Sequence, residues 1–554
     1  IVFTCQTEDY KDVLERLYRI NITLNIIDFE LKTNVHDYIS EIRTHFPVLS
    51  GLFKHSHLTP ILNNLKYLDL LAYNLSKSAS ITEADYIGES TIIDWIWKKE
   101  IDSIGAQSSR FIQDFSEKQA QNLSISIPVS GFSISDLSPL DSLKESKVFV
   151  EIDDRLFLTH DLFGDWARYK LIRANKANIK SFLLSKDLFS PLWCKAIRLY
   201  GIYLLENNKD ASEWMKLFNS LVTSESNEKI IQDLLLESII FSSDIFTYLT
   251  ALWDLFNQNE GEIFNRFLDQ FLLKATLPNK NILKLAKEIG GYSVAEASTY
   301  DRIPNHLYWG DILNFIHSKK NEIIKISRLK TATITKMWLE YTPSDFLYRK
   351  ECSEIALANA NWIFDFKQNV GFVKGDVDEN IYKAFLMGIT ENPSEVIELA
   401  LKLCKRIKVA NDEKKQDKNP NSNRKSISVF GHAKIRDKVK WPDGPYERVD
   451  DAFEKICIKE NPLKPIIDSF PEKAKEILLA LFIDAPKEIS YGYDYHYKLD
   501  INEPHNWFPP FYTRGPFLYF LNHNSKMGIE FIVSLVNFAT EQWTNSYKSK
   551  RLEI

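Results

Sequence analysis

The stretch RLFLTHDLFGDWARY, residues 155–169, contains the change from strand to helix that decides the fold of this chain. Its first half is apolar and ends at His160. In its second half, apolar residues recur at helical spacing, namely Leu162, Trp166 and Tyr169. We therefore predict a β-strand that leads directly into a helix. A histidine between a strand end and a helix start is well placed to face a bound anion.

The residues before this stretch complete a recognisable unit. Residues 148–152 and 155–159 have the pattern of two strands around an Asp-Asp turn, which predicts a β-hairpin. Residues 88–107 and 109–125 have the period of amphipathic helices. Helices followed by a single hairpin are typical of a winged helix, which we predict across residues 88–168.

The remainder of the chain is mostly helical in pattern. Residues 1–32 alternate strand, helix and strand, as at the edge of an α/β unit, and residues 33–87 have helical patterns. From 169 to 405 nearly every segment has helical period and tryptophans recur at irregular intervals, which predicts a TPR/HEAT-like repeat array. Residues 406–436 are polar and low in complexity, so we expect a flexible loop there, followed by C-terminal helical repeats at 437–554. The predicted fold class is mainly α, with an α/β remnant, a winged-helix domain and a helical solenoid.

Composition limits the class of protein. Glycine is sparse, with 18 in 554 residues, which disfavours an all-β fold rich in glycine turns. The net charge of −6 gives no general attraction to nucleic acid or to anionic membranes. The five cysteines lack metal or redox spacing, and no apolar run reaches 18 residues, so we predict a cytoplasmic chain without a membrane span. Because residues 1–5 already have the pattern of a buried strand, we expect a fragment of a longer protein.

Five segments together carry a resemblance, namely residues 1–6 (IVFTCQ), 65–71 (LKYLDLL), 88–97, 159–167 (THDLFGDWA) and 515–543. They resemble the STAND branch of the P-loop NTPases, and most of all the bacterial antiphage group called Avs, which is related to NACHT and NB-ARC proteins. In the order given, they are similar to the sensor-1 strand, the helix near the adenine, the first winged-helix element, the Met-His-Asp junction and the sensor arrays of this group. Two positions depart from the family pattern. Gln6 stands where the family usually has an arginine, and Leu65 replaces a proline. The chain contains no G-x-x-x-x-G-K-S/T phosphate-binding sequence.

The resemblance implies a protein that is switched by ATP and ADP. His160 would bind the β-phosphate of ADP in the resting state, Asp161 would cap the following helix, and Gln6 would contact a phosphate oxygen without charge assistance. Residues 1–32 would be the edge of the NTPase core and residues 33–87 its helical lid. The full-length protein would bind ATP or ADP with Mg, whereas this fragment alone would bind no cofactor and would contain no catalytic residue.

The resemblance also implies a role in antiviral defence. The helical array would sense a phage protein, and the activated protein would form a homo-oligomer that triggers an N-terminal effector. The alternative is an α-helical scaffold that binds proteins independently of nucleotide, in which His160 only satisfies a strand end. A winged-helix DNA binder is disfavoured, because the hairpin carries Glu151, Asp153 and Asp154.

Other candidate sites are weaker. His55 and His57 lie close in sequence, as do Asp494 and His496, but neither pair has partners at zinc spacing, so no metal site is expected. The aromatic stretch at 491–512 either contacts a protein partner or fills space between helices.

Overall fold

The computed structural model describes residues 38–77, 88–188, 190–221, 225–279, 281–282, 302–370, 379–404, 407–409, 446–448, 463–483 and 515–552. The expected α/β edge at residues 1–32, including Gln6, lies outside the described residues, as does the aromatic stretch at 491–512. The chain divides into two compact units, Ile1–Phe315 and Ile316–Ile554.

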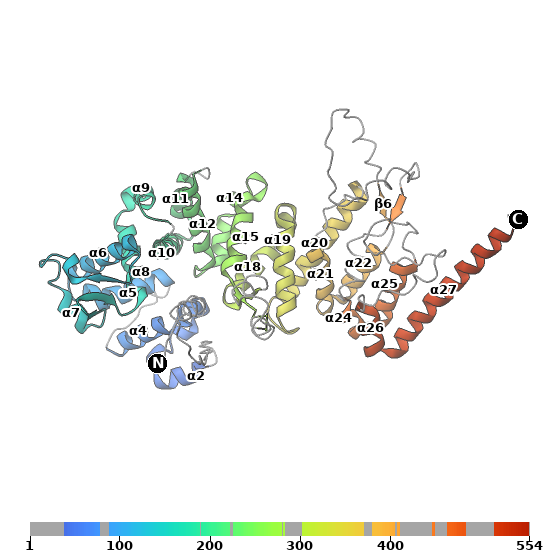
Figure 1. Ribbon diagram of the computed structural model, residues 1–554, viewed down its shortest axis with the longest axis horizontal. Helices are drawn as coiled ribbons and strands as arrows, with labels where there is room; N and C mark the ends of the chain where they lie inside the picture. Colours follow the sequence, from blue (N-terminus) through green and yellow to red (C-terminus); the bar gives the residue numbers. More distant parts are fainter. Residues whose placement is uncertain are drawn as a thin grey trace, which may run out of the picture. The chain divides into compact units, whose positions relative to one another are not determined.

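Helices dominate the regular structure of the described residues, which confirms the prediction of a mainly α fold (Figure 1). The strands in this part of the chain are short and form one three-stranded and two two-stranded antiparallel sheets. None of the described helices is both long enough and apolar enough to cross a membrane.

The first described segment, residues 38–77, is called here the N-terminal module. It contains α2 (Ile39–His45), η2 (Pro47–Leu49), η3 (Leu52–Lys54), η4 (Ser56–Leu58), α3 (Thr59–Leu62) and α4 (Leu65–Ser76). The side chain of Asn64 caps α4 by accepting hydrogen bonds from the backbone N–H groups of Lys66 and Tyr67. The module has its own apolar core, in which the most deeply buried side chains are Leu49, Leu52, Leu58, Leu62 and Leu71.

The next segment combines helices with the three-stranded sheet, whose strand order is β1-β3-β2. In chain order its elements are α5 (Glu89–Trp97), the π-helical turn η6 (Lys98–Asp102), α6 (Ala106–Asn122), β1 (Ser126–Pro128), η7 (Val129–Gly131), α7 (Leu140–Glu145), β2 (Phe149–Ile152) and β3 (Arg155–Leu158). The predicted hairpin is confirmed, because β2 and β3 pair in antiparallel fashion. Asp153 and Asp154 form its turn with φ angles of 49° and 57°, a left-handed conformation that aspartate tolerates better than most residues.

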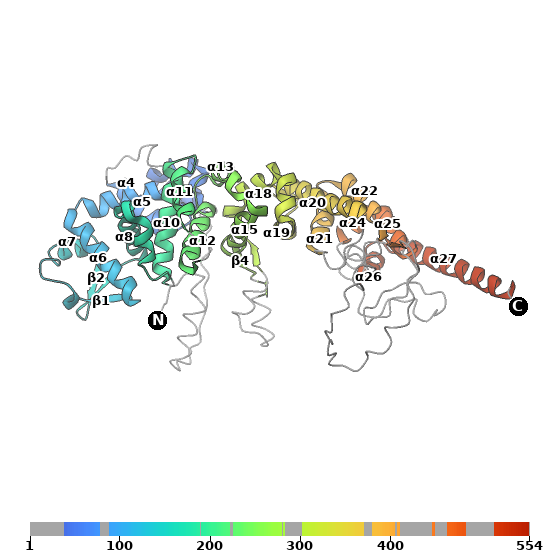
Figure 2. The ribbon, with the colours of Figure 1, turned by 90° about the horizontal axis from the view of Figure 1, so that it is seen from above.

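A helical region follows the hairpin within the same unit. Its elements are α8 (Asp161–Ala174), η8 (Lys176–Asn178), α9 (Ile179–Leu184), α10 (Pro191–Asn207), α11 (Ser212–Ser220), α12 (Ser226–Ile240), α13 (Ile245–Ala251), α14 (Trp253–Phe256), η9 (Asn259–Gly261), α15 (Glu262–Lys274), β4 (Thr276–Pro278), β5 (Arg302–Pro304) and α18 (His306–Ser318). Helix α10 is central, because it packs against α5, α8 and α12 (Figures 1 and 2). The tryptophans noted in the sequence are core residues here: Trp193, Trp214, Trp253 and Trp309 are buried.

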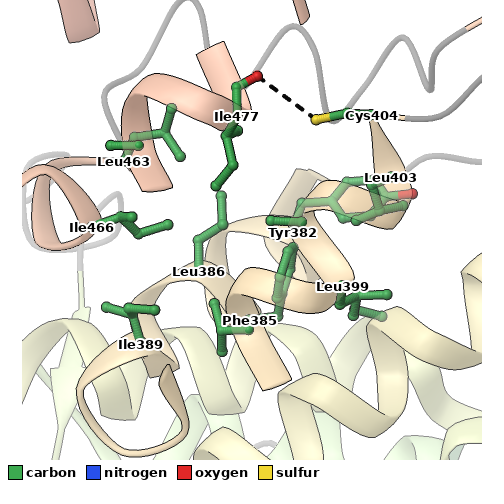
Figure 3. Close-up of a cluster of buried hydrophobic side chains, with 14 of the residues drawn as sticks. Tyr382, Phe385, Leu386, Ile389, Leu399, Leu403, Cys404, Leu463, Ile466 and Ile477 are labelled. Carbon is green, nitrogen blue, oxygen red and sulfur yellow. Dashed lines mark hydrogen bonds between the residues drawn. The ribbon is translucent and has the colours of Figure 1, made fainter. Parts of the chain in front are cut away.

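The second unit is also built from helices. They are α19 (Lys320–Tyr341), α20 (Arg349–Val370), α21 (Glu379–Met387), η10 (Gly388–Thr390), α22 (Pro393–Leu403), α24 (Lys464–Ser469), α25 (Pro471–Ile483), α26 (Gly515–His523) and α27 (Ser525–Leu552). Figure 3 shows how side chains of α21, including Phe385 and Leu386, meet Ile466 of α24 and Ile477 of α25 in one apolar cluster. At its edge, the Cys404 thiol donates to the carbonyl oxygen of Ile477 at 3.8 Å.

The segment expected to be a flexible polar loop, residues 406–436, begins with a strand. β6 (Ile407–Val409) pairs with β7 (Tyr446–Arg448) in antiparallel fashion. Ile407 and Val409 are β-branched, and such residues favour extended backbone. The remainder of residues 406–436 lies outside the described part of the chain.

Candidate functional site

His160 lies between the hairpin and α8, as its position in the sequence predicts. Strand β3 ends at Leu158, and the backbone N–H of Thr159 still donates to the carbonyl of Val148 at 3.0 Å. His160 then takes the N-cap position of α8, with an extended backbone. Its Nδ1 atom accepts a hydrogen bond from the backbone N–H of Leu162 at 3.2 Å. The imidazole ring is therefore held in place by the helix that it caps.

The expectation that Asp161 caps this helix is wrong, because His160 has that role. Asp161 is the first residue of α8, where its carboxylate interacts favourably with the positive end of the helix dipole. The Nδ1 lone pair of His160 takes the place of the side-chain oxygen that usually accepts at an N-cap. In a neutral imidazole that accepts at Nδ1, the proton is on Nε2, so the ring has one N–H donor.

The surroundings of His160 favour the neutral ring. Burial lowers the pKa of His160 below its ordinary value of 6.5, and the positive charges of Lys66 and Lys195 lower it further, while Asp161 opposes the shift. The two lysines belong to different helices, α4 and α10. Charges of both signs act on this ring, because the carboxylates of Asp161 and Asp165 oppose the effect of the two lysines. Lys195 is itself paired with Asp165 at 2.6 Å, and Lys66 with Asp69 at 3.0 Å. What the ring offers an anion, such as a phosphate oxygen, is its neutral N–H donor.

A buried ion-pair cluster fixes α8 on its neighbours. The carboxylate of Asp165 accepts from Nη2 of Arg168 at 2.8 Å and lies 2.6 Å from Nζ of Lys195. The same arginine donates through Nη1 to the carbonyl of Ser116 in α6 and through Nε to the carbonyl of Leu192 in α10. Asp165 and Arg168 are almost fully buried. Removal of Asp165 would leave the buried charge of Arg168 without its counter-ion, so the orientation of α8 depends on this cluster.

A second polar cluster joins α4 to α5 and α8. The hydroxyl of Tyr67 donates to Oε1 of Glu89 at 2.8 Å and accepts from Nε1 of Trp166 at 3.2 Å. The rings of Tyr67 and Trp166 also pack together, with centroids 5.4 Å apart. Burial raises the pKa of Tyr67 well above its ordinary value of 10, and the carboxyl of Glu89 raises it further. The phenol therefore keeps its proton near neutral pH and serves as a donor.

Glu206, at the end of α10, reaches the beginning of α5. Its carboxyl group accepts from the backbone N–H groups of Glu89 at 2.9 Å and Ser90 at 3.0 Å, and from the Ser90 hydroxyl. These bonds satisfy N–H groups that have no partner within the helix. Burial raises the pKa of Glu206 to about 7, although the bonds from Ser90 act in the opposite direction. There is room for this carboxyl because residue 88 is glycine: a Cβ at Gly88 would lie 1.9 Å from Oε1 of Glu206.

Of the three site residues predicted from the sequence, the structure describes two. His160 and Asp161 are adjacent at the start of α8, whereas Gln6 lies outside the described residues. Leu65 is the first residue of α4 and is 51 % exposed, directly before Lys66 and Tyr67.

Sequence reasoning did not find the contacts of Tyr67, Glu89 and Glu206. Glu89 and Glu206 are 117 positions apart, so no local pattern links them. The one sign of a buried carboxyl group in the sequence is that Glu206 directly follows the apolar run LYGIYLL, residues 199–205.

Within the described part of the chain, no group of three or more His, Cys, Asp or Glu side chains is arranged to hold a metal ion. A comparison of the chain with protein-family models finds no match, and a comparison with curated proteins finds no significant match either. Any function inferred for this chain therefore depends on the geometry around His160 and on the motifs of residues 88–97 and 159–167.

Proposed function

We propose that this chain is part of an ATP/ADP-switched STAND NTPase in antiphage defence. The observation that carries the proposal is the state of His160, whose Nδ1 is occupied by the Leu162 N–H and whose pKa is lowered. A neutral ring held in this way has its proton on Nε2 and can donate to a phosphate oxygen. Lys66 and Lys195 add positive charge to the surroundings of the ring, and Asp161 and Asp165 add negative charge, so the support lies in the N–H donor.

The strand order supports a winged-helix domain at residues 88–168. In the sheet β1-β3-β2, the hairpin follows α7 and its second strand lies in the middle. A hairpin that follows helices in this way is the pattern expected for the wing. We assign the helical lid to residues 33–87 and the sensor array to the helices of residues 169–405 and 437–554.

The proposed mechanism is a switch between two conformations. In the resting protein, a P-loop outside this chain would hold ADP and Mg, and His160 would donate a hydrogen bond to the β-phosphate. A phage protein binds the helical array, and the ATP-bound open form then assembles into a homo-oligomer that activates an N-terminal effector in the cytoplasm. Coupling requires that the phage protein bind the open form more tightly than the closed form.

The test compares two substitutions of His160 in the full-length protein. His160→Ala removes both the helix cap and the imidazole, whereas His160→Ser retains a side-chain oxygen that can cap α8. Loss of a hydrogen bond to a charged phosphate should weaken ADP binding about 10- to 100-fold in both variants. The measurement is the ADP retained by the purified protein, together with effector activity in the absence of phage protein.

The serine variant separates the two roles of the histidine. If His160→Ser has normal thermal stability, loses ADP and becomes active without a trigger, the phosphate contact is supported. If His160→Ser retains as much ADP as the wild type and stays inactive, His160 is only a helix cap and the phosphate contact is refuted. A wild-type protein that retains no ADP would instead favour the nucleotide-independent scaffold.

A further inference from the structure

The N-terminal module, residues 38–77, is attached to the rest of its unit through hydrogen bonds of polar side chains and through the packing of the Tyr67 ring on Trp166. Within the module, α4 contacts η2 and α3, and Leu49, Leu52 and Leu71 are buried. At the beginning of α4, the Tyr67 hydroxyl bonds to Glu89 of α5 and Trp166 of α8. At the end of α4, the amide of Asn74 donates to Oε1 of Glu100 in η6 at 2.6 Å.

These two attachment points lie on one face of α4. Tyr67 and Asn74 are seven residues, or about two helical turns, apart, and both side chains are buried. Each contacts a carboxyl group, one in the first residue of α5 and the other in η6. The two contacts therefore fasten α4 along the segment formed by α5 and η6.

A joint of this kind can separate and form again. Carboxyl, phenol and amide groups can exchange their partners for water when the surfaces part, so the net free energy of each bond is modest. The contacts of α4 with η2 and α3 lie within the N-terminal module, so they would remain during this separation.

The joint also lies close to the candidate phosphate contact. Trp166 is in the second turn of α8, the helix that His160 caps. Lys66 is next to Tyr67 in the chain and affects the pKa of His160. The beginning of α4 and the beginning of α8 are therefore in the same region of the unit.

We propose that Tyr67 is a latch that fastens the N-terminal module to α5 and α8 in the resting conformation, and that breaking its two hydrogen bonds releases this module. The inference rests on the proposed switch, because the module would be the helical lid that separates from the winged-helix domain on activation. The latch itself is a property of this chain, so it can be tested without nucleotide.

The test is hydrogen exchange measured by mass spectrometry on the whole chain carrying Tyr67→Phe. The substitution removes one hydroxyl, which takes the donor from Glu89 and the acceptor from Trp166. Amides of α4 and of the first turn of α5 should exchange about 10- to 100-fold faster, while amides of α12 remain unchanged. The matched control is Tyr73→Phe on the same helix, because Tyr73 is 48 % exposed and its hydroxyl accepts a hydrogen bond from the ammonium group of Lys77, four residues later at the end of the same helix. This control should exchange like the wild type.

Two results would overturn the latch. One is unchanged exchange of α4 in Tyr67→Phe, and the other is faster exchange spread equally over α4, α10 and α12, which would make Tyr67 an ordinary core residue. If the variant does not fold, native-state exchange of the unmodified chain in low urea replaces it. Helix α4 should then open at lower urea than α12, and joint opening of the two helices would refute the proposal.

The Tyr67 and His160 experiments have independent outcomes, so the latch and the phosphate contact can be judged separately. Selective release of α4 in Tyr67→Phe, combined with normal ADP retention in the His160 variants, would support the latch and reject the contact between His160 and the phosphate. Loss of ADP in the His160 variants with no effect of Tyr67→Phe would do the reverse.

Discussion

Gly88→Ala tests whether the carboxyl of Glu206 holds α5 in place. The new Cβ would lie 1.9 Å from Oε1 and 2.4 Å from Cδ of Glu206, so the carboxyl group must move away. The backbone of Gly88 is extended, with φ of 177°, so alanine adds no conformational strain. Displacement breaks the three hydrogen bonds that Glu206 makes to Glu89 and Ser90. At pH 8, above the pKa of about 7 that burial gives Glu206, bonds to its ionised carboxylate contribute about 1.5–3 kcal/mol each. Relaxation recovers part of the loss, so we expect a destabilisation of about 3–5 kcal/mol.

A double-mutant cycle with Glu206→Ala identifies the cause of this loss. Without the carboxyl group there is no clash, so Gly88→Ala should cost less than about 1 kcal/mol in the Glu206→Ala background, leaving a coupling energy of about 2–5 kcal/mol. The free energy is measured as the urea dependence of exchange for amides in α5, which reports the opening of this helix rather than of the whole chain. An equal effect of Gly88→Ala in both backgrounds, or no effect in either, would refute the reasoning.

Two further predictions concern buried charged groups. Since the pKa of Glu206 is raised from 4.5 to about 7, its contribution to stability is complete below pH 4.5 and is lost as the pH rises through 7. Glu206→Gln cannot ionise, so its melting temperature should fall less than that of the wild type between pH 5 and pH 8; parallel pH profiles would contradict this. In the second unit, Arg349 is paired with Glu391 at 2.5 Å and both side chains are buried. Arg349→Met should destabilise α20 by about 3–5 kcal/mol, and Arg349→Met with Glu391→Leu should recover most of the loss. The measurement is urea-dependent exchange of α20 amides, and a double variant no better than the single one would contradict it.

Local patterns predicted the elements around the candidate site. The hairpin and the start of α8 follow from alternating and helical periods in neighbouring residues, and the buried positions Leu162, Trp166 and Tyr169 are those that the helical period indicated. The cap at this helix was assigned to the wrong residue. His160 and Asp161 both carry acceptors beside the helix start, and only the backbone conformation decides which of the two reaches the Leu162 N–H.

The mainly helical fold, the position of the hairpin and the histidine between hairpin and helix could be predicted from the amino-acid sequence, because these features depend on residues close together in the chain. The contacts among Tyr67, Glu89, Trp166 and Glu206 could be found only from the folded structure. Their hydrogen bonds join helices that are 22 to 117 positions apart in sequence, and such pairs depend on how whole helix faces pack. A carboxyl group in the last turn of α10 acquires its role only when that packing brings the unpaired N–H groups of α5 within reach.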